Sequence, residues 1–406
     1  MKILVVTSYY KPAYVYGGPT RSISLLCEAM AKRGADITVL TTNANGPSVL
    51  DVPVGKPMSV DGVRVFYFPV FRATGSFFYS PSLARAIFSS VPRCDIVTCE
   101  ALWEFALLPT MVACRRHRKP YVMPLRGQLM DWALEQKSWK KKVSLFLAGD
   151  HSLKRAAALH CTDPAEEHAV AALGIATPTF VVPNGLDLST IAVPVGGRYD
   201  LKVRMGLPRD ARVLLFLGRL KRIKRADIAV DVLHAVKKIC SQAHLVIAGP
   251  DEDNLTPELK AQATSLGCSE SVHFAGLVEK ADVLSLLAET DLLLVPTEVQ
   301  ENFSMSTLEA LSVGVPVLVS RGIPVGYWAE KAGAGRIAGA TSTEFVEAAL
   351  QLFAEPETLK AMGEQGRRVV QENFDIDKVA GQMLAHYEAI VATGRPLRET
   401  GALHGL

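Results

Sequence analysis

The chain has 406 residues, of which 49% are hydrophobic and 21% are charged, and its formal net charge is +3. This length is too great for one ordinary hydrophobic core, and the composition is that of a globular enzyme, so two domains are predicted. A charge this close to balance gives no general case for binding nucleic acid. The seven scattered cysteines, an odd number with no C-x-x-C pair, favour neither a disulfide framework nor a zinc cluster.

The amino-terminal segment begins MKILVV and turns polar after Val6, so it lacks the apolar region and cleavage site of a signal peptide. No segment reaches the roughly 18 apolar residues that a membrane-spanning helix needs. The expected location is therefore the cytoplasm, whose reducing conditions suit the free cysteines.

Short apolar runs alternate with longer helical patterns along the whole chain. The predicted strands of the first half are 3–7, 37–42, 63–68, 95–99 and 120–125, and those of the second half are 212–218, 244–249, 272–276, 291–296 and 316–320. Continuous apolar strands of this kind are typical of parallel sheets covered by helices on both faces. The pattern predicts an α/β fold of two doubly wound Rossmann-like domains that face a central cleft.

The pattern is interrupted between Asn184 and Gly197, where prolines and glycines precede a new strand at Arg212. We expect an amino-terminal domain on the acceptor side over residues 1–185 and a carboxyl-terminal domain over residues 186–374. The remaining residues, 375–406, are expected to form a helix and a tail.

Glu301 and Glu309 lie eight residues apart, where the loop after the strand at 291–296 leads into a helix predicted to begin near Ser304. The helix dipole and the free backbone N–H groups at a helix start can hold a diphosphate. The candidate binding residues are Asn302, Phe303, Ser304, Met305 and Ser306. Glu309 can accept hydrogen bonds from ribose, and Glu301 can face the sugar. A solvated acidic helix start explains the same spacing, because the dipole favours glutamate there.

Arg219 and Lys224 follow the first strand of the second half and are expected at the edge of the sheet where Glu301 lies. Two fixed cations there can neutralise a departing nucleoside diphosphate without a metal ion. An exposed basic turn is the alternative. In the first half, Gly17 and Gly18 precede a helix and allow a ligand to approach the backbone, although an ordinary turn has the same sequence.

Taken together, these motifs resemble glycosyltransferase family 4, which has the GT-B fold. The resemblance rests on Gly17-Gly18, Gly218-Arg219 with Lys224, Pro183-Asn184-Gly185-Leu186-Asp187 and the Glu301/Glu309 pair, and it covers nearly the whole chain. It implies a retaining transfer from a nucleotide diphosphate sugar, with neither a metal nor another cofactor. Arg219 and Lys224 would contact the diphosphate, Glu309 the ribose, and Glu301 the transferred sugar.

Two positions depart from the family pattern. Asn302 and Ser304 stand where the family usually has glycine, and Arg126-Gly127 stands where many members have His-Gly. The stretch PLRGQLMDWAL resembles a branch that acts in exopolysaccharide or O-antigen (lipopolysaccharide) biosynthesis, so Arg126 is included among the catalytic-site residues. A surface arginine in a loop is the alternative. A guanidinium cannot act as a base, so the role of Arg126 would be electrostatic or in binding.

The resemblance implies a saccharide or polyprenyl-linked acceptor, and Glu100, Trp103 and Glu104 are candidates for the acceptor side, although core packing and a solvated helix start explain them equally well. The basic segment Lys137–Lys142 has the pattern of a peripheral contact with an anionic membrane, and also that of a solvated helix face. The resemblance further implies that a helix over 375–390 returns to the amino-terminal domain.

Two other functions remain open. A GT-B nucleotide-sugar epimerase or hydrolase would share the fold and the donor site, but it would need a base or a group that activates water. A non-catalytic subunit that binds nucleotide sugars would have no need of the full set of cations and carboxylates. A dehydrogenase is poorly supported, because neither half has the dinucleotide glycine pattern.

Overall fold

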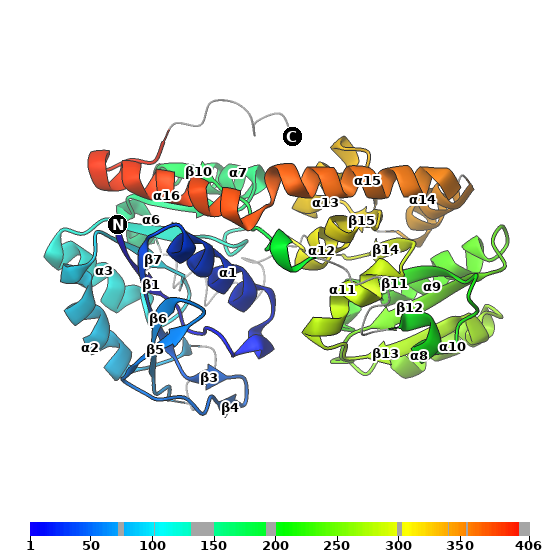
Figure 1. The fold of residues 1–406 in the computed structure, drawn as a ribbon, viewed down its shortest axis with the longest axis horizontal. Helices are drawn as coiled ribbons and strands as arrows, with labels where there is room; N and C mark the ends of the chain where they lie inside the picture. The colour runs from blue at the N-terminus through cyan, green and yellow to red at the C-terminus, as the bar shows by residue number, and fades with distance from the viewer. Residues whose placement is uncertain are drawn as a thin grey trace. The chain divides into compact units, whose positions relative to one another are not determined.

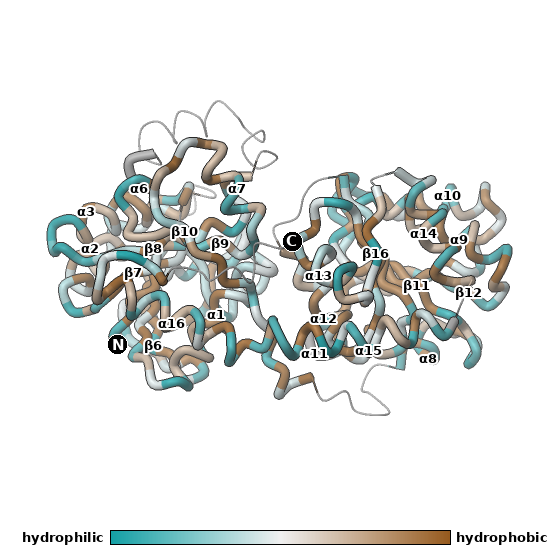
Figure 2. Tube along the Cα trace, turned by 90° about the horizontal axis from the view of Figure 1, so that it is seen from above, coloured by the Kyte–Doolittle hydropathy of each residue, from teal (hydrophilic) through white to brown (hydrophobic). Residues whose placement is uncertain are grey.

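A computed structural model of the chain describes residues 1–71, 77–100, 102–130, 150–191, 200–298, 303–339, 341–354 and 356–397. The chain forms two compact units. Unit 1 contains Met1–Gly185 and Phe374–Leu406, and unit 2 contains Leu186–Asn373. In Figure 2 the hydrophobic residues run through the interior of each unit, as expected of two separate cores.

Unit 1 is built on a sheet whose described strands follow the order β10-β9-β8-β7-β1-β2-β6-β5. The strands pair in parallel except for the edge strand β5, which is antiparallel to β6. The strands are β1 (Lys2–Val6), β2 (Asp36–Thr42), β5 (Pro57–Val60), β6 (Val63–Phe68), β7 (Ile96–Cys99), β8 (Tyr121–Pro124), β9 (Ala158–Cys161) and β10 (Thr179–Val181). A short hairpin joins β3 (Ala44–Asn45) to β4 (Ser48–Val49).

Helices cover both faces of this sheet, because successive side chains of a strand point in opposite directions. On β1, Ile3 and Val5 join the core formed with α1 and α16, whereas Leu4 and Val6 join the core formed with α2 and α3. The helices are α1 (Gly18–Lys32), α2 (Pro81–Ser90), α3 (Leu107–His117), α6 (Asp150–Arg155), α7 (Pro164–Ala172) and α16 (Ile376–Thr393). Unit 1 also contains the 3-10 turns η1 (Tyr14–Tyr16) and η3 (Val91–Arg93), whereas the 3-10 turn η5 (Leu188–Thr190) belongs to unit 2.

The carboxyl-terminal helix α16 belongs to the core of unit 1 and lies beside α1 (Figure 1). The carboxylate of Asp375 caps its start by accepting a hydrogen bond from the backbone N–H of Asp377 at 3.0 Å. Its buried face follows helical spacing and consists of Ile376, Val379, Ala380, Met383, His386, Tyr387 and Ile390.

Unit 2 is built on a parallel sheet whose described strands follow the order β13-β12-β11-β14-β15-β16. The strands are β11 (Arg212–Leu217), β12 (Ala243–Ala248), β13 (Val272–Gly276), β14 (Leu292–Val295), β15 (Val317–Ser320) and β16 (Gly335–Ala338). The helices are α8 (Leu201–Met205), α9 (Ala226–Val236), α10 (Thr256–Ser265), α11 (Lys280–Ala288), α12 (Met305–Val313), α13 (Pro324–Lys331), α14 (Ser342–Ala354) and α15 (Pro356–Asn373), with the 3-10 turns η6 (Arg222–Lys224) and η7 (Ser269–Ser271).

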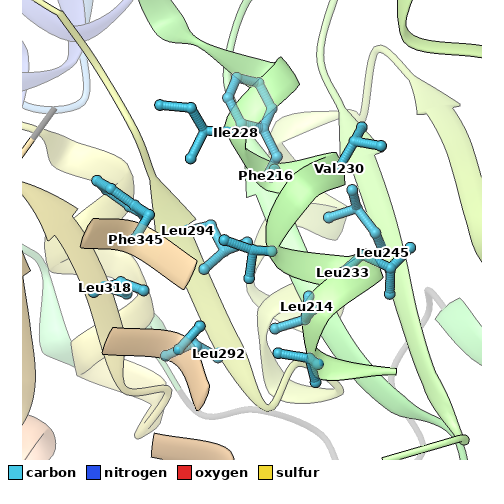
Figure 3. Packing of buried hydrophobic residues seen from close by; sticks show 14 of the residues in the cluster. Leu214, Phe216, Ile228, Val230, Leu233, Leu245, Leu292, Leu294, Leu318 and Phe345 are labelled. Carbon is cyan, nitrogen blue, oxygen red and sulfur yellow. The ribbon is translucent and has the colours of Figure 1, made fainter. Parts of the chain in front are cut away.

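The core of unit 2 fixes the edge from which its polar loops emerge. Leu214 and Phe216 of β11 are buried against Ile228 of α9, Leu294 of β14 and Phe345 of α14 (Figure 3). Burying side chains of this size contributes about 1.5–3 kcal/mol each, so the strand ends that carry the loops are held firmly.

The predicted fold class is confirmed, since both units contain a parallel Rossmann-like sheet. Each of the ten predicted strands is present. The structure adds β3, β4, β5, β9, β10 and β16, whose runs are short and weakly patterned in the sequence. In the described residues, no helix combines the length and apolar character needed to cross a bilayer. Glu301, Asn302 and Lys137–Lys142 lie outside the described residues.

Candidate active site

The candidate cations of unit 2 lie in the loop that follows β11. Gly218 directly follows β11, and Gly249 directly follows the neighbouring strand β12. A Cβ atom on Gly249 would lie 1.9 Å from the Gly218 carbonyl oxygen, a clash that only glycine avoids. The side chain of Arg219 is 59% exposed and lies 3.3 Å from a carboxylate oxygen of Glu252. Lys224 ends the 3-10 turn η6 and is partly buried. Arg219 is therefore held by a weak exposed pair and remains open to an anion.

Two hydrogen bonds join this basic loop to the segment that leads towards Glu301. The backbone N–H of Glu298 and the hydroxyl of Thr297 both donate to the carbonyl of Ile223, each at 3.0 Å. An ion pair between Arg225 and Glu298, also at 3.0 Å, strengthens the junction. The loop of the cations and the described residues 297 and 298, from which the chain continues towards Glu301, are thus neighbours within one unit.

Beyond the undescribed residues 299–302, the chain enters α12. Phe303 is 3% exposed, and Met305 and Ser306 form the first turn, where backbone N–H groups have no partner within the helix. Ser304, the N-cap residue, has φ 58 and ψ 79, a left-handed conformation that favours glycine. Its hydroxyl lies 2.7 Å from that of Thr307. Glu309 lies one turn into the helix and is partly buried.

The departure from glycine at position 304 therefore leaves the backbone in a conformation typical of glycine. The Ser304 hydroxyl is bonded to that of Thr307 within the first turn of α12. The order predicted from the sequence, a loop, then a helix start, then Glu309 inside the helix, agrees with the described part of the chain.

In unit 1, Gly17 and Gly18 begin α1. Gly17 is the N-cap residue with φ 74, and no atom lies within 4 Å of the Cβ position of either glycine. Ser22, one turn further into α1, lies 3.1 Å from the guanidinium of Arg126. The structure therefore brings the glycine pair and Arg126 to one part of unit 1.

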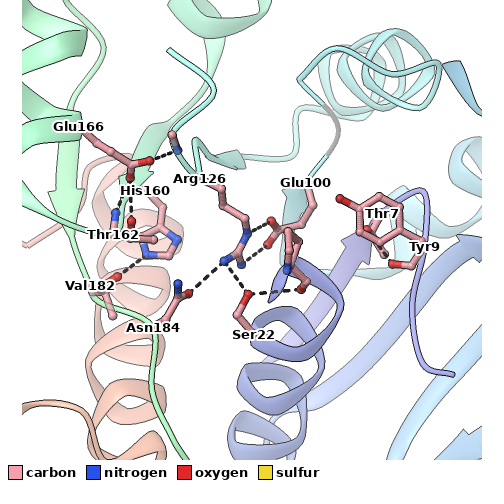
Figure 4. A network of polar contacts seen from close by, with 12 residues as sticks. Thr7, Tyr9, Ser22, Glu100, Arg126, His160, Thr162, Glu166, Val182 and Asn184 are labelled. Carbon is pink, nitrogen blue, oxygen red and sulfur yellow. Dashed lines mark hydrogen bonds and ion pairs between the residues drawn. The ribbon is translucent and has the colours of Figure 1, made fainter. Parts of the chain in front are cut away.

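Arg126 is buried, which excludes the alternative of a surface arginine. It follows β8 with φ 47, and its side chain is only 6% exposed. Its Nε and Nη2 donate to the two oxygens of Glu100 at 2.6 and 3.1 Å, and its Nη1 donates to Ser22 and to Asn184, each at 3.1 Å (Figure 4). Four of the five guanidinium N–H groups are thus used within unit 1.

The Arg126–Glu100 pair links the ends of two neighbouring strands, because Glu100 directly follows β7. Burial lowers the pKa of Arg126, but the charge and hydrogen bonds of Glu100 outweigh it, so the pKa lies above its ordinary value. The arginine is therefore fully charged, fixed in place and unable to act as a base.

Two further carboxyl groups near this pair are buried in unit 1. Glu166 of α7 accepts hydrogen bonds from the N–H groups of Gly127 and Thr162, the latter at 2.6 Å, and burial raises its pKa to about 7. Burial also raises the pKa of Glu104 to about 7, and the charge of Glu100 adds to this shift. Trp103 packs against the core shared by α2 and α3, which supports the core interpretation of this residue.

Sequence reasoning missed an aromatic group beside Arg126. The rings of Tyr9 and Tyr16 are stacked with centroids 4.4 Å apart, and the ring of Phe78 meets both edge-on. Tyr9 is close enough to Arg126 and Glu104 for their charges to affect its pKa, which burial raises. The signal that was available is the Tyr9-Tyr10 pair, which begins three residues after β1, near the strand end where ligands of such folds bind.

Comparisons with known proteins agree with this division into two units. Residues 17–185 match the glycosyl transferase 4-like domain, and residues 199–369 match the glycosyl transferases of group 1. A D-inositol 3-phosphate glycosyltransferase of Kineococcus radiotolerans is 30% identical over 207 residues, which is 47% of each chain. The chain spans about half the length of the curated relatives it matches.

Solved structures share the whole fold. HepE of Anabaena, crystallised in complex with UDP and glucose, has a TM-score of 0.74 at 20% identity, with 95% of this chain and 98% of that chain covered. WaaG, a glycosyltransferase involved in lipopolysaccharide biosynthesis, has a TM-score of 0.66 at 17% identity, with 94% and 99% covered. At these identities the likeness shows the fold alone.

Proposed function

Because the chain belongs to the group 1 glycosyltransferases and has their GT-B fold, we propose that it is a retaining glycosyltransferase. It moves a sugar from a nucleoside diphosphate sugar to a saccharide or lipid-linked saccharide, in the synthesis of a cell-surface polysaccharide at the inner face of the cell membrane. The hydrogen bonds that hold the Arg219–Lys224 loop against the segment leading to Glu301 carry this proposal.

In the proposed reaction the acceptor oxygen bonds to the anomeric carbon while the bond to the diphosphate oxygen breaks, and the acceptor proton leaves with the diphosphate. Arg219 and Lys224 neutralise the charge that develops on the leaving group. The single exposed pair with Glu252 costs little to break, so Arg219 can exchange it for a diphosphate. The first turn of α12 supplies backbone N–H groups to the same diphosphate.

The roles of Glu301 and Asn302 are proposed from the sequence, because both residues lie outside the described part of the chain. Glu301 faces the transferred sugar, and Glu309 accepts hydrogen bonds from the ribose. In unit 1, Gly17, Gly18 and Arg126 belong to the part of the site that is proposed to face the acceptor. The burial of Arg126 in an ion pair disfavours an epimerase or hydrolase that needs a base at this position.

Alanine at Arg219 or at Lys224 tests the donor site. Either change should lower turnover by about 100-fold or more, as expected when a preorganised electrostatic contact is lost. Arg222→Ala is the matched control, because Arg222 is exposed in the same loop and pairs with Glu258 at 2.6 Å. Turnover near the wild-type value in both test variants would show that the diphosphate is held elsewhere.

Thermal shift with UDP, GDP and ADP sugars identifies the donor, since a ligand at 100 times its Kd stabilises by about 2.7 kcal/mol. Product analysis by NMR separates glycosyl transfer with retention from epimerisation and from hydrolysis. Nucleotide binding without turnover of any donor would favour the non-catalytic subunit. Full activity after exhaustive EDTA treatment is expected, whereas a loss that manganese or magnesium restores would contradict the metal-independent mechanism.

A further inference from the structure

A basic pocket of about 360 Å³ opens on unit 1 where α3 ends, β8 begins and α6 ends. Met111 and Tyr121 contribute apolar surface to its lining. Among the described residues, no carboxylate lines the pocket, whereas four cations do: Arg115, Arg118, Lys119 and Arg155. Four like charges around one cavity repel each other unless an anion lies between them.

These cations are not needed to cap the helices at whose ends they lie. Basic side chains at a helix carboxyl end commonly bond the last carbonyl groups. In the described part of the chain, however, the last turn of α3 is closed by backbone hydrogen bonds, from the N–H of Arg118 to the carbonyls of Cys114 and Arg115. The structure gives none of the four side chains a hydrogen bond or an ion pair within the described residues. Among the residues that the structure describes, their charge is therefore not taken up by a hydrogen bond or an ion pair.

The ligand has an apolar part as well as a charge. On α3, Leu108 and Val112 are 55% and 42% exposed, and they lie seven and three residues before Arg115 on one helical stripe. The apolar lining of the pocket continues this stripe through Met111. An inorganic anion would gain nothing from these apolar groups, whereas a lipid with an anionic head group matches both features.

The walls of the pocket are fixed before any ligand arrives. The hydroxyl of Tyr121 donates to the carbonyl of Ser152 at 2.6 Å, and the hydroxyl of Ser152 donates to the sulfur of Met111 at 3.1 Å. These bonds join β8, α6 and α3. The pocket lies at the amino-terminal end of β8, whereas Arg126 follows its carboxyl-terminal end.

We propose that this pocket binds the head group of an anionic membrane lipid while Leu108 and Val112 enter the interfacial layer of the bilayer. The opposite end of the sheet, which carries Arg126, is then left open to substrates. The proposal assigns membrane contact to described residues of unit 1 and is independent of the Lys137–Lys142 segment. It does not require the proposed sugar transfer.

The test is co-sedimentation of the full chain with vesicles of phosphatidylcholine alone and of phosphatidylcholine mixed with phosphatidylglycerol. The wild-type protein should bind only the anionic vesicles. Arg115→Gln/Arg118→Gln should lower partitioning by about 30-fold, since each basic residue near an anionic surface contributes about fivefold. The matched control is Arg209→Gln/Arg368→Gln, which removes the same charge from exposed positions of unit 2.

Partitioning of the pocket variant equal to that of the wild type or of the control variant would overturn the proposal. So would loss of binding in Lys140→Gln/Lys141→Gln that the pocket variant does not share. Thermal stabilisation by inorganic phosphate, absent in the pocket variant and without vesicle binding by the wild type, would assign the pocket to free phosphate instead. The thermal shift with nucleotide sugars should be unchanged in the pocket variant, which separates this site from the donor site.

Discussion

The buried pair of Arg126 and Glu100 allows a quantitative test of what holds the loops of unit 1 in place. Glu100→Gln removes the partner charge but keeps the size of the side chain, which leaves a guanidinium that is 6% exposed without its carboxylate. Breaking one side of a buried pair costs about 3–5 kcal/mol, because the remaining charge is uncompensated. Arg126→Met leaves Glu100, 5% exposed, in the same situation and should cost a similar amount.

The double variant Glu100→Gln/Arg126→Met leaves neither charge behind. Its cost should be smaller than the sum of the single costs by about 2 kcal/mol or more, because the two changes act on one interaction. The exposed pair of Arg219 and Glu252, with side chains 59% and 36% exposed, provides the contrast. Glu252→Gln should cost less than about 1 kcal/mol in unit 2.

Hydrogen exchange measured by mass spectrometry gives the opening free energy of each unit separately, which a single melting temperature of a two-unit chain does not. Peptides from β7 and β8 report on the pair of unit 1, and peptides from β11 and β12 report on the control. If Glu100→Gln costs no more than Glu252→Gln, or if the single costs add in the double variant, the pair does not organise these strand ends.

Three further results are expected. Glu309→Gln should chiefly raise the donor KM, and Glu301→Gln should chiefly lower kcat while calorimetry still detects nucleotide binding; the reverse pattern would exchange their roles. Burial raises the pKa of Glu166 from 4.5 to about 7. Between these two pKa values, the folded chain keeps a proton on Glu166 that the unfolded chain releases. This difference contributes up to about 3 kcal/mol to the stability of the folded chain; the contribution is fully present below the unfolded pKa and is lost as the pH rises through about 7. Glu166→Gln should make the exchange free energy of unit 1 flatter over this range, and an equal slope in both proteins would contradict this. Gly18→Ala should leave stability unchanged, since no atom lies within 4 Å of the new Cβ, yet lower turnover; unchanged kcat and KM would remove this glycine from the site.

The fold was predictable because its central strands are long, continuous apolar runs such as RVLLFL at β11. The strands that escaped prediction are short or mixed. Examples are TFV at β10 and GRIA at β16, whose three or four residues carry too little pattern to be separated from loops. Their place in the sheets is set by pairing with β9 and β15, a contact that a local pattern does not contain.

The candidate site was predictable where its residues are close in sequence. The basic loop after β11 is one such segment, but its hydrogen bonds to residues 297 and 298 span more than 70 positions and could not be read from spacing. The burial of Arg126 could not be predicted from spacing either, since its partner Glu100 is 26 positions away. A signal was nevertheless present: both residues follow predicted strands, and parallel neighbours bring such ends together.

Position 304 shows that a residue with a Cβ atom can occupy a backbone conformation that favours glycine. A left-handed backbone costs a residue with a Cβ atom roughly 1–2 kcal/mol relative to its preferred conformation, and glycine avoids this cost. Ser304 nevertheless adopts φ 58, and its hydroxyl lies 2.7 Å from that of Thr307 in the first turn of α12. The surrounding structure, including the neighbouring Phe303, which is 3% exposed, therefore fixes the backbone conformation of this turn. The residue type at position 304 changes only the stability of that conformation. The same reasoning applies to Arg126, which has φ 47 and is held by its contacts with Glu100, Ser22 and Asn184. At both positions the backbone path follows from tertiary contacts, so a change of residue type alone is not evidence of a lost site.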